Sequence, residues 1–218
     1  MNRAKSKTRP VIFDLDGTLV DSLPLVLRAF AHALEPFGSR PTMEIFARLG
    51  GPPKRIFPTL LDDVRHVPAA LERLQAFNRE HDHLIRPFEG VSIALEQLRA
   101  RGALLALWTG RDRTTTDWLL REHRLTDFFS TVVCGDDLPT HKPDPEGLRE
   151  ILRRLKLDAD EALLVGDADV DVLGGVACGI DTVLISHSRD VAETVRVQAW
   201  RTVTSPVEAF ELVAGRLS

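Results

Sequence analysis

Five short apolar segments alternate with helical patterns along most of this sequence, and this alternation limits the possible folds more than any other feature. The apolar segments have the length of β-strands and cover Val11–Asp16, Ala103–Trp108, Thr131–Cys134, Ala162–Val165 and Thr182–Ile185. A weaker sixth segment lies at Trp200–Val203, and the helical patterns include Ser92–Arg101, Arg113–His123 and Pro145–Leu155. Because strands that are buried on both faces are apolar throughout, the pattern predicts an α/β fold: a doubly wound parallel sheet with helices on both faces.

Residues 20–87 interrupt this alternation. They contain helical patterns broken by prolines and no convincing strand. Leu71, Leu74 and Phe77 recur at helical spacing, which predicts that they face inward on one amphipathic helix. The interval is too long for an ordinary connection between a strand and a helix. We therefore expect residues 20–87 to form a helical subdomain inserted into a core of residues 10–19 and 88–218, with residues 1–9 as a disordered basic tail.

The composition is that of a globular protein large enough to bury a core. The chain has 218 residues, of which 44% are hydrophobic, and its net charge of −4 argues against nucleic-acid binding, which needs a basic surface. No apolar stretch approaches the roughly 20 residues that span a bilayer. The basic N-terminus lacks the apolar segment of a secretory signal, and Cys134 and Cys178 lack the spacing of a zinc site. We expect a cytoplasmic monomer or homodimer that contacts neither membranes nor nucleic acid.

The first apolar segment ends in Asp14-Leu15-Asp16-Gly17-Thr18. Alternation along a strand would direct both carboxylates the same way, and Gly17 permits a sharp turn after them. Two acids at the end of a buried strand are unfavourable unless a cation or a reaction uses them. The plainer alternative is an Asp-rich turn without further function, because Asp and Gly are common turn formers.

Polar residues also follow the next three predicted strands. Thr109-Gly110-Arg111 follows the second strand, Lys142 lies in the loop after the third, and Asp167 ends the fourth. Ligands bind beyond the carboxyl ends of strands in open parallel sheets, so these residues are expected to converge. A hydroxyl and free N–H groups at such a position can hold phosphate, and a lysine in a proline-stiffened loop can neutralise it. Taken singly, Thr109 is better explained as a capping residue and Lys142 as a solvated lysine.

Three acids, Asp167, Asp169 and Asp171, lie close together after the fourth strand. Acids this close repel one another unless a cation joins them, and oxygen ligands without histidine or thiolate favour Mg²⁺ over zinc. Capping of the following helix accounts for one acid, and Asp169 is the candidate for that role.

Together these residues resemble the four ordered motifs of the haloacid dehalogenase superfamily. The resemblance rests on Asp14–Thr18, Thr109, Lys142-Pro143 and Gly166–Asp171. The helical insertion resembles the small cap domain of that superfamily. Pro87–Gly90 and Leu125–Phe129 resemble its phosphoglycolate phosphatase-like branch. One departure is Gly110, which stands where relatives usually carry asparagine.

The resemblance implies a phosphatase that acts on a small phosphorylated metabolite, a phosphoglycolate-like monoester. Asp14 would attack phosphorus and form an aspartyl-phosphate that water then hydrolyses. Asp16 would act as general acid towards the leaving oxygen and then as general base on water. The cofactor would be Mg²⁺, held by Asp14, the backbone carbonyl of Asp16, Asp167 and Asp171.

The remaining site residues follow from the same resemblance. Lys142 and Thr109 would stabilise charge on the equatorial phosphoryl oxygens. Thr18, Gly110 and Arg111 would line the substrate site. Thr18 also favours hydrolysis over phosphomutase activity, because related phosphomutases commonly carry valine there.

Substrate choice is expected to depend on the inserted segment that contains Gly51, Lys54 and Arg55. We hypothesise that Lys54 or Arg55 meets a carboxylate or second phosphate of the substrate, and a solvated helix start is an equal alternative. The spacing of Gly51 and Lys54 also resembles phosphonatases, in which Lys54 would form a Schiff base. A non-catalytic binding protein on the same fold is a further alternative, although the joint presence of the acids and Lys142 argues against it.

Overall fold

The core of the protein is a parallel sheet. The computed structural model describes residues 9–217, and residues 1–8 of the predicted tail lie outside this range. In that range six strands pair in the order β5-β4-β1-β6-β7-β8, and each of these pairings is parallel. Their bounds are Pro10–Phe13 (β1), Leu104–Trp108 (β4), Thr131–Val133 (β5), Leu163–Gly166 (β6), Asp181–Ile185 (β7) and Arg201–Val203 (β8). The five predicted strands and the weaker sixth are therefore confirmed, with small shifts at their ends.

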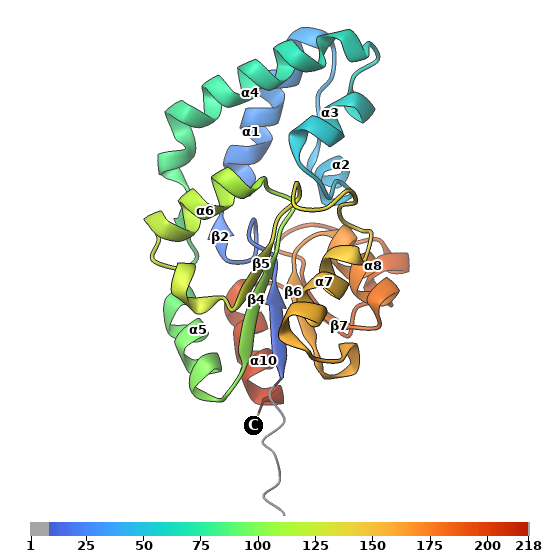
Figure 1. Cartoon of the computed structure of the whole chain (residues 1–218). Coiled ribbons are helices and arrows are strands. Elements are labelled where there is room, and N and C mark those ends of the chain that lie inside the picture. The colour runs from blue at the N-terminus through green and yellow to red at the C-terminus, as the bar shows by residue number, and fades with distance from the viewer. Residues whose placement is uncertain (1–8, 218) are drawn as a thin grey trace, which may run out of the picture.

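Helices cover both faces of this sheet (Figure 1). Alternate residues of β1 show it: Val11 and Phe13 pack in one hydrophobic cluster, and Ile12 packs in another. The first cluster includes side chains from α5 (Val91–Ala100), α6 (Arg113–Glu122) and α10 (Pro206–Arg216). The second includes side chains from α7 (Glu146–Leu155). Because each β-strand sends successive side chains to opposite faces, this division confirms the doubly wound α/β fold.

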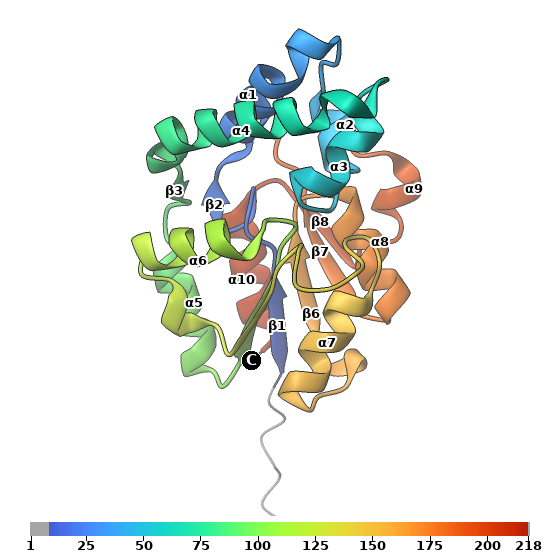
Figure 2. The same ribbon diagram turned by 45° about the horizontal axis from the view of Figure 1, so that its top comes forward.

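The helical insertion lies above the carboxyl ends of the strands (Figures 1 and 2). Its elements are α1 (Leu23–Leu34), η1 (Glu35–Phe37), α2 (Met43–Ala47), α3 (Pro53–Leu60), η2 (Val64–His66), α4 (Val67–His81) and η3 (Asp82–Leu84). These helices share a hydrophobic cluster of their own, which includes Phe30, Phe57 and Leu74. Leu71 and Phe77 pack against that cluster, as the spacing along α4 predicts.

A short antiparallel pair joins the insertion to the core, and the sequence analysis missed it. It consists of β2 (Val20–Asp21) and β3 (Arg86–Pro87). Two residues per strand are too few to produce a recognisable alternation. The pair brings the chain's exit from the core and its return side by side.

The remaining elements complete the core. They are η4 (Thr126–Phe128), η5 (Ala159–Glu161), α8 (Asp169–Cys178) and α9 (Glu193–Arg196). Among residues 9–217, no helix has both the length and the apolar character needed to cross a bilayer.

Candidate active site

Three carboxylates meet where β1 and β6 end. Asp14 follows β1, Asp167 follows β6, and Asp171 lies in the first turn of α8. Oxygen atoms of the three lie within 4.8 Å of one another, and the residues are 7%, 8% and 0% exposed. β1 ends at Phe13, three residues before the predicted end at Asp16, and the backbone N–H of Asp14 donates to the carbonyl of Val165 over 2.8 Å. Pairing with β6 therefore places Asp14 beside Asp167.

Lys142 lies against these acids, as the predicted convergence of loops requires. Its Nζ is 2.8 Å from Oδ1 of Asp14 and 2.6 Å from Oδ1 of Asp171. The side chain is only 3% exposed, and its Nζ lies 4.7 Å from the centroid of the Trp108 ring. Burial opposes the positive charge, but Asp14 and Asp171 outweigh burial, so the pKa of Lys142 is raised. The ammonium group is therefore charged at neutral pH.

One lysine does not balance three buried acids. Burial raises the pKa of Asp14 to about 7; Lys142 opposes this shift, and the charges of Asp171 and Asp16 add to it. Burial also raises the pKa of Asp167 well above its usual range, with Asp14 and Asp171 adding to the effect. The cluster is thus an electrostatic environment in which an additional cation would be stabilised.

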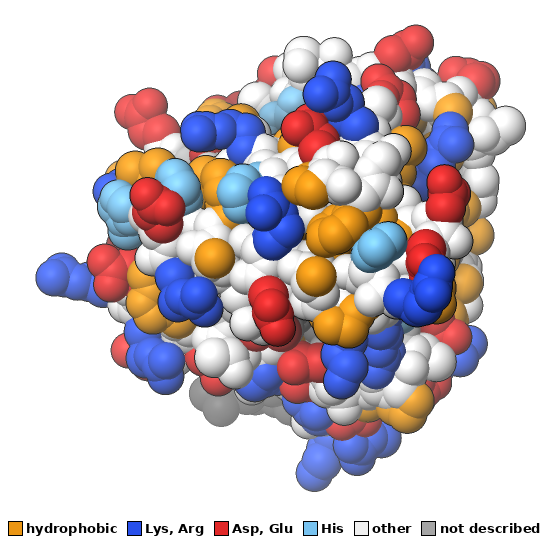
Figure 3. Space-filling view, turned by 90° about the horizontal axis from the view of Figure 1, so that it is seen from above, with side chains coloured by type: hydrophobic (Ala, Val, Ile, Leu, Met, Phe, Trp, Pro, Cys, Tyr) orange, Lys and Arg blue, Asp and Glu red, His pale blue; other side chains and the backbone are white. Residues whose placement is uncertain are grey.

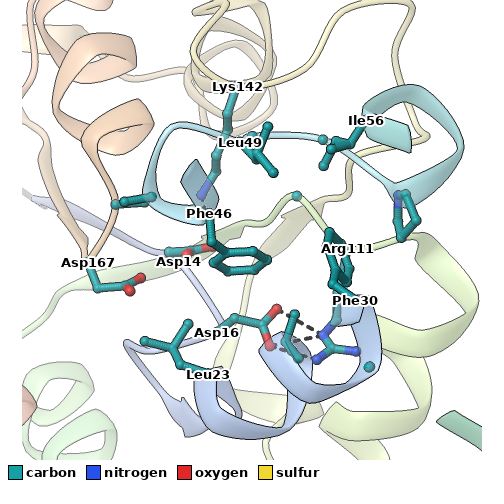
Figure 4. A pocket seen from close by; sticks show the side chains of 18 of the residues that line it. Asp14, Asp16, Leu23, Phe30, Phe46, Leu49, Ile56, Arg111, Lys142 and Asp167 are labelled. Carbon is teal, nitrogen blue, oxygen red and sulfur yellow. Dashed lines mark hydrogen bonds and ion pairs between the residues drawn. The ribbon is translucent and has the colours of Figure 1, made fainter. Parts of the chain in front are cut away.

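Asp16 faces the other side of the site, where two groups hold its carboxylate. Arg111 binds it through two N–H donors, with Nε 2.8 Å from Oδ2 and Nη2 2.7 Å from Oδ1 (Figure 4). Ser22 Oγ donates to Oδ1 over 2.5 Å. Burial disfavours the charge of Arg111, but Asp16 outweighs it, and the pKa of Arg111 is raised. The sequence analysis missed Ser22, because no motif marks a residue whose role depends on the turn between β2 and α1.

The two threonines are buried near these acids. Thr109 is 2% exposed, and its Oγ1 accepts a hydrogen bond from the backbone N–H of Arg111 over 3.1 Å. Thr18 is fully buried, and its Oγ1 has no hydrogen-bond partner among the described residues. Both lie on the turns that follow β1 and β4, which is where the sequence placed them.

Glycines let the insertion approach the core closely. A Cβ on Gly50 would lie 2.2 Å from the carbonyl oxygen of Lys142, and one on Gly51 would lie 2.7 Å from Cγ of His141. A Cβ on Gly110 would lie 3.3 Å from the backbone of Gly50. Gly110 therefore sits directly beneath the inserted loop, in a space that a larger side chain would have to share with that loop.

The two basic residues of the insertion that the sequence analysis proposed for substrate binding lie outside this site. Lys54 is exposed, and Arg55 donates to the carbonyls of Pro139 (2.7 Å) and Leu138 (2.8 Å) in the core. Neither is among the described residues that line the pocket between the insertion and the sheet. Their contact with substrate remains a hypothesis, and this arrangement gives Arg55 a different partner.

Asp169 does not cap α8, contrary to the sequence-based expectation. Its Oδ1 is 2.7 Å from Nη1 of Arg189, and both side chains are at most 10% exposed. Asp171 instead accepts a hydrogen bond from the backbone N–H of Ala168, over 3.1 Å. Arg189 also donates to the carbonyl of Asp167 over 3.1 Å. The sequence gave no signal for Arg189, because it reaches the site from the loop after β7.

The pocket has a charged floor and an apolar roof. Asp14, Asp16, Arg111, Lys142 and Asp167 lie on the side of the sheet (Figure 4). The insertion contributes mainly hydrophobic side chains, among them Leu23, Phe30, Phe46, Leu49 and Ile56. An anionic group attached to a small apolar group fits this division.

Known proteins are similar to this chain in sequence and in fold. The family model for haloacid dehalogenase-like hydrolase matches residues 11–185. The protein named pyrophosphatase PpaX of Halalkalibacterium halodurans is 32% identical over 189 residues, covering 82% of this chain and 83% of its own length. Its namesake in Bacillus velezensis is 32% identical over 188 residues, covering 85% and 86%.

Solved structures agree with this comparison at the level of the fold. A hydrolase from Pseudomonas syringae superposes with a TM-score of 0.81 at 25% identity, over 97% of this chain and 100% of that one. A predicted phosphoglycolate phosphatase from Haemophilus somnus gives a TM-score of 0.77 at 20% identity, over 94% and 98%. The family match covers residues 11–185, which contain all four motifs and the acids Asp14, Asp167 and Asp171. This chain therefore belongs to the haloacid dehalogenase-like hydrolases.

Proposed function

We propose that this protein is a Mg²⁺-dependent phosphatase that hydrolyses a small phosphate monoester through a phosphorylated Asp14. The observation that carries the proposal is the buried contact of Lys142 with Asp14 and Asp171, beside Asp167. It supports the proposal because the candidate nucleophile Asp14, the charged Lys142 and the candidate metal ligands line one pocket. The relatives named pyrophosphatase support phosphoryl transfer as the reaction class.

The acidic cluster fits a hard divalent cation. Asp14, Asp167 and Asp171 bring carboxylate oxygens within 4.8 Å of one another, and burial together with the neighbouring acids raises the pKa of Asp14 and Asp167 despite the opposing charge of Lys142. These three residues and the backbone carbonyl of Asp16 would hold Mg²⁺, in keeping with its preference for oxygen ligands. When bound, Mg²⁺ neutralises charge on phosphoryl oxygens and on the attacking carboxylate.

The chain's own residues divide the remaining chemistry. Asp14 attacks phosphorus and forms an acyl phosphate as the alcohol leaves. For the first step Asp16 must be protonated, which the negative charge of Asp14 and of the substrate favours. It gives this proton to the leaving oxygen and then takes one from the water that attacks the acyl phosphate, which restores Asp14 and releases phosphate. Ser22 and Arg111 hold the Asp16 carboxylate in place before the reaction.

Lys142 and Thr109 complete the phosphate site in this proposal. Lys142 is held at the cluster by two carboxylates, so it loses little further freedom when it binds a phosphoryl oxygen. In this proposal Thr109 and the N–H groups after β4 donate to the same phosphoryl group. The helical insertion acts as a cap that closes the pocket over the reacting groups and limits the access of bulk solvent.

Pyrophosphate hydrolysis is the second candidate, because the relatives described above carry that name. It would use the same nucleophile and lysine. The phosphonatase alternative needs Lys54 in the pocket, and the structure places that side chain at the surface. A phosphomutase would return an isomer instead of free phosphate.

Phosphate release from p-nitrophenyl phosphate tests the proposal. We expect turnover with Mg²⁺, none with EDTA, and a loss of about a thousandfold or more in Asp14→Asn. Acid-quenched samples of the wild type should carry a phosphoryl group on the Asp14 peptide by mass spectrometry. Asp160→Asn, on the exposed turn η5, serves as a surface control. Undiminished turnover in Asp14→Asn would overturn the proposed mechanism.

A further inference from the structure

We propose that the natural substrate is a phosphate monoester whose alcohol part is apolar and uncharged, an alkyl or aryl group of at least four carbons. This inference rests on the proposed phosphatase function and specifies its substrate. It separates this protein from enzymes that bind a second anionic group next to the phosphate. The lining of the pocket above Asp14 carries the argument.

The part of the pocket that receives the leaving group is apolar. The insertion presents Leu23, Phe30, Met43, Phe46, Leu49 and Ile56 to the cavity. Phe46 and Asp14 line the same pocket, and in the view of Figure 4 the Phe46 ring lies beside Asp14, with Leu49 and Ile56 higher in the picture. Phe30 packs edge-on against Phe46, with ring centroids 5.5 Å apart. A leaving group bonded to a phosphorus atom at Asp14 would therefore extend among hydrocarbon side chains.

The insertion offers no cation to a second anion. Among the described residues that line the pocket, its polar side chains are Asn78 and Asp82, and the only charge is the negative one of Asp82. Arg55 of the insertion donates to core carbonyls, and on the face seen from above Lys and Arg are mixed with Asp and Glu (Figure 3). Arg28, Arg48 and Lys54, for example, are exposed.

The cations of the core are already matched. Of the described lining residues, Lys142 pairs with Asp14 and Asp171, and Arg111 pairs with Asp16. The third, Arg189, pairs with Asp169. A carboxylate or second phosphate would have to be desolvated among Phe46, Leu49 and Ile56, or would have to take Arg111 away from Asp16. Both cost free energy that an uncharged leaving group avoids.

The test uses alkyl phosphates, whose alcohols have similar acidity. Chain length therefore changes the apolar area that is buried in the pocket and leaves the reactivity of the ester bond nearly the same. Each buried methylene contributes a factor of about three to four, so kcat/KM should rise about tenfold from ethyl to butyl phosphate. The kcat/KM for phosphoglycolate and that for pyrophosphate should each be at least about tenfold lower than that for butyl phosphate, because both substrates bring an additional charge. A flat alkyl series, or a preference for either charged substrate, would overturn the inference.

A binding measurement keeps this inference separate from the proposed function. Titration calorimetry with ethyl- and butylphosphonate and with phosphonoacetate, in Mg²⁺, needs no turnover. Tighter binding of butylphosphonate without any hydrolysis of esters would contradict the phosphatase proposal and support the apolar site. Hydrolysis of esters together with tighter binding of phosphonoacetate would support the phosphatase proposal and contradict the apolar site.

Variants locate the effect in the pocket. Phe46→Ala should reduce the ratio of butyl to ethyl phosphate kcat/KM about threefold or more, because it removes apolar contact area. Phe37→Ala is the matched control: Phe37 lies in the same insertion, stacks on His66 with centroids 4.8 Å apart, and does not line the pocket. Leu49→Asn, which keeps side-chain size and removes apolar character, provides the same test if Phe46→Ala does not fold. An unchanged ratio in the folded pocket variants would contradict the inference.

Discussion

At the scale of single residues, the buried acids affect both the proposed chemistry of this protein and its stability. Asp14, Asp167 and Asp171 share one lysine, so the metal-free cluster carries excess negative charge in a buried position. This arrangement would suit the divalent cation of the proposed function. We also expect the metal-free protein to be more stable when one of these charges is removed.

Asp14→Asn should therefore stabilise the metal-free protein at high pH. The folded pKa of Asp14 is raised from 3.8 to about 7, so the contribution of this residue is fully present below about pH 4 and is lost as pH rises through 7. Asparagine does not ionise. In EDTA we expect urea unfolding to give similar free energies at pH 4 and a gain on the order of 2–4 kcal/mol for the variant at pH 8.

Asp160→Asn, at an exposed acid, should show no such gain. Mg²⁺ should raise the stability of the wild type more than that of Asp14→Asn, because the variant has one carboxylate fewer. A variant less stable than the wild type at pH 8 in EDTA would show that the Lys142 contact, rather than repulsion among the acids, dominates the cluster.

At the scale of elements, the loop between α2 and α3 decides how closely the insertion meets the core. Gly50 and Gly51 leave no room for a side chain over His141 and Lys142, and Gly110 lies beneath them. These glycines come from segments far apart in the chain, and together they form one close backbone contact. Phe46 lies in α2 just before this loop and Leu49 lies within it, so the contact helps to set the position of both side chains in the pocket.

Gly50→Ala should therefore impair catalysis. The new Cβ would lie 2.2 Å from the Lys142 carbonyl, so the loop or Lys142 must move. A displacement of about 1 Å near reacting groups is enough to reduce kcat/KM about a hundredfold, and we expect at least tenfold for p-nitrophenyl phosphate. The control is Gly215→Ala in α10, where nothing lies within 4 Å of the added Cβ. It should keep full activity and gain about 0.5–1 kcal/mol of stability. Equal activities in the two variants would contradict a role for the close contact.

The same elements show what the sequence could and could not predict. The strands and the residues at their ends were predictable because buried parallel strands are apolar throughout and ligand sites follow their carboxyl ends. The partners Ser22 and Arg189 were not, because their roles depend on the turn between β2 and α1 and on the loop after β7, which no local pattern marks. The roles of Gly50 and Gly51 were missed for the same reason: a glycine that permits close approach carries no local pattern.

At the scale of the whole molecule, the core and the insertion form one pocket between them. The core supplies the charged groups, and the insertion supplies a hydrophobic roof with its own buried cluster. Two kinds of contact join them on the side of α3: the glycine contact and the hydrogen bonds from Arg55 to the carbonyls of Leu138 and Pro139. On the side of α3, the position of the roof over the acids thus depends on a few contacts at its edge, which would suit a part that, in the proposed function, admits substrate and releases phosphate.

Arg55→Ala should weaken this closed arrangement, and Lys54→Ala should not. Loss of two hydrogen bonds from a charged donor, each worth about 1.5–3 kcal/mol at most, shifts the insertion towards open positions. We expect kcat/KM to fall about tenfold or more for every phosphate ester alike, with faster amide exchange in α3 measured by mass spectrometry. Lys54 is the neighbouring residue with an exposed side chain, so its variant is a matched control and should keep the wild-type order of substrates. If Lys54→Ala or Arg55→Ala instead reduced activity only towards substrates with a second anionic group, these cations would recognise substrate directly, and the apolar roof would not be what selects it.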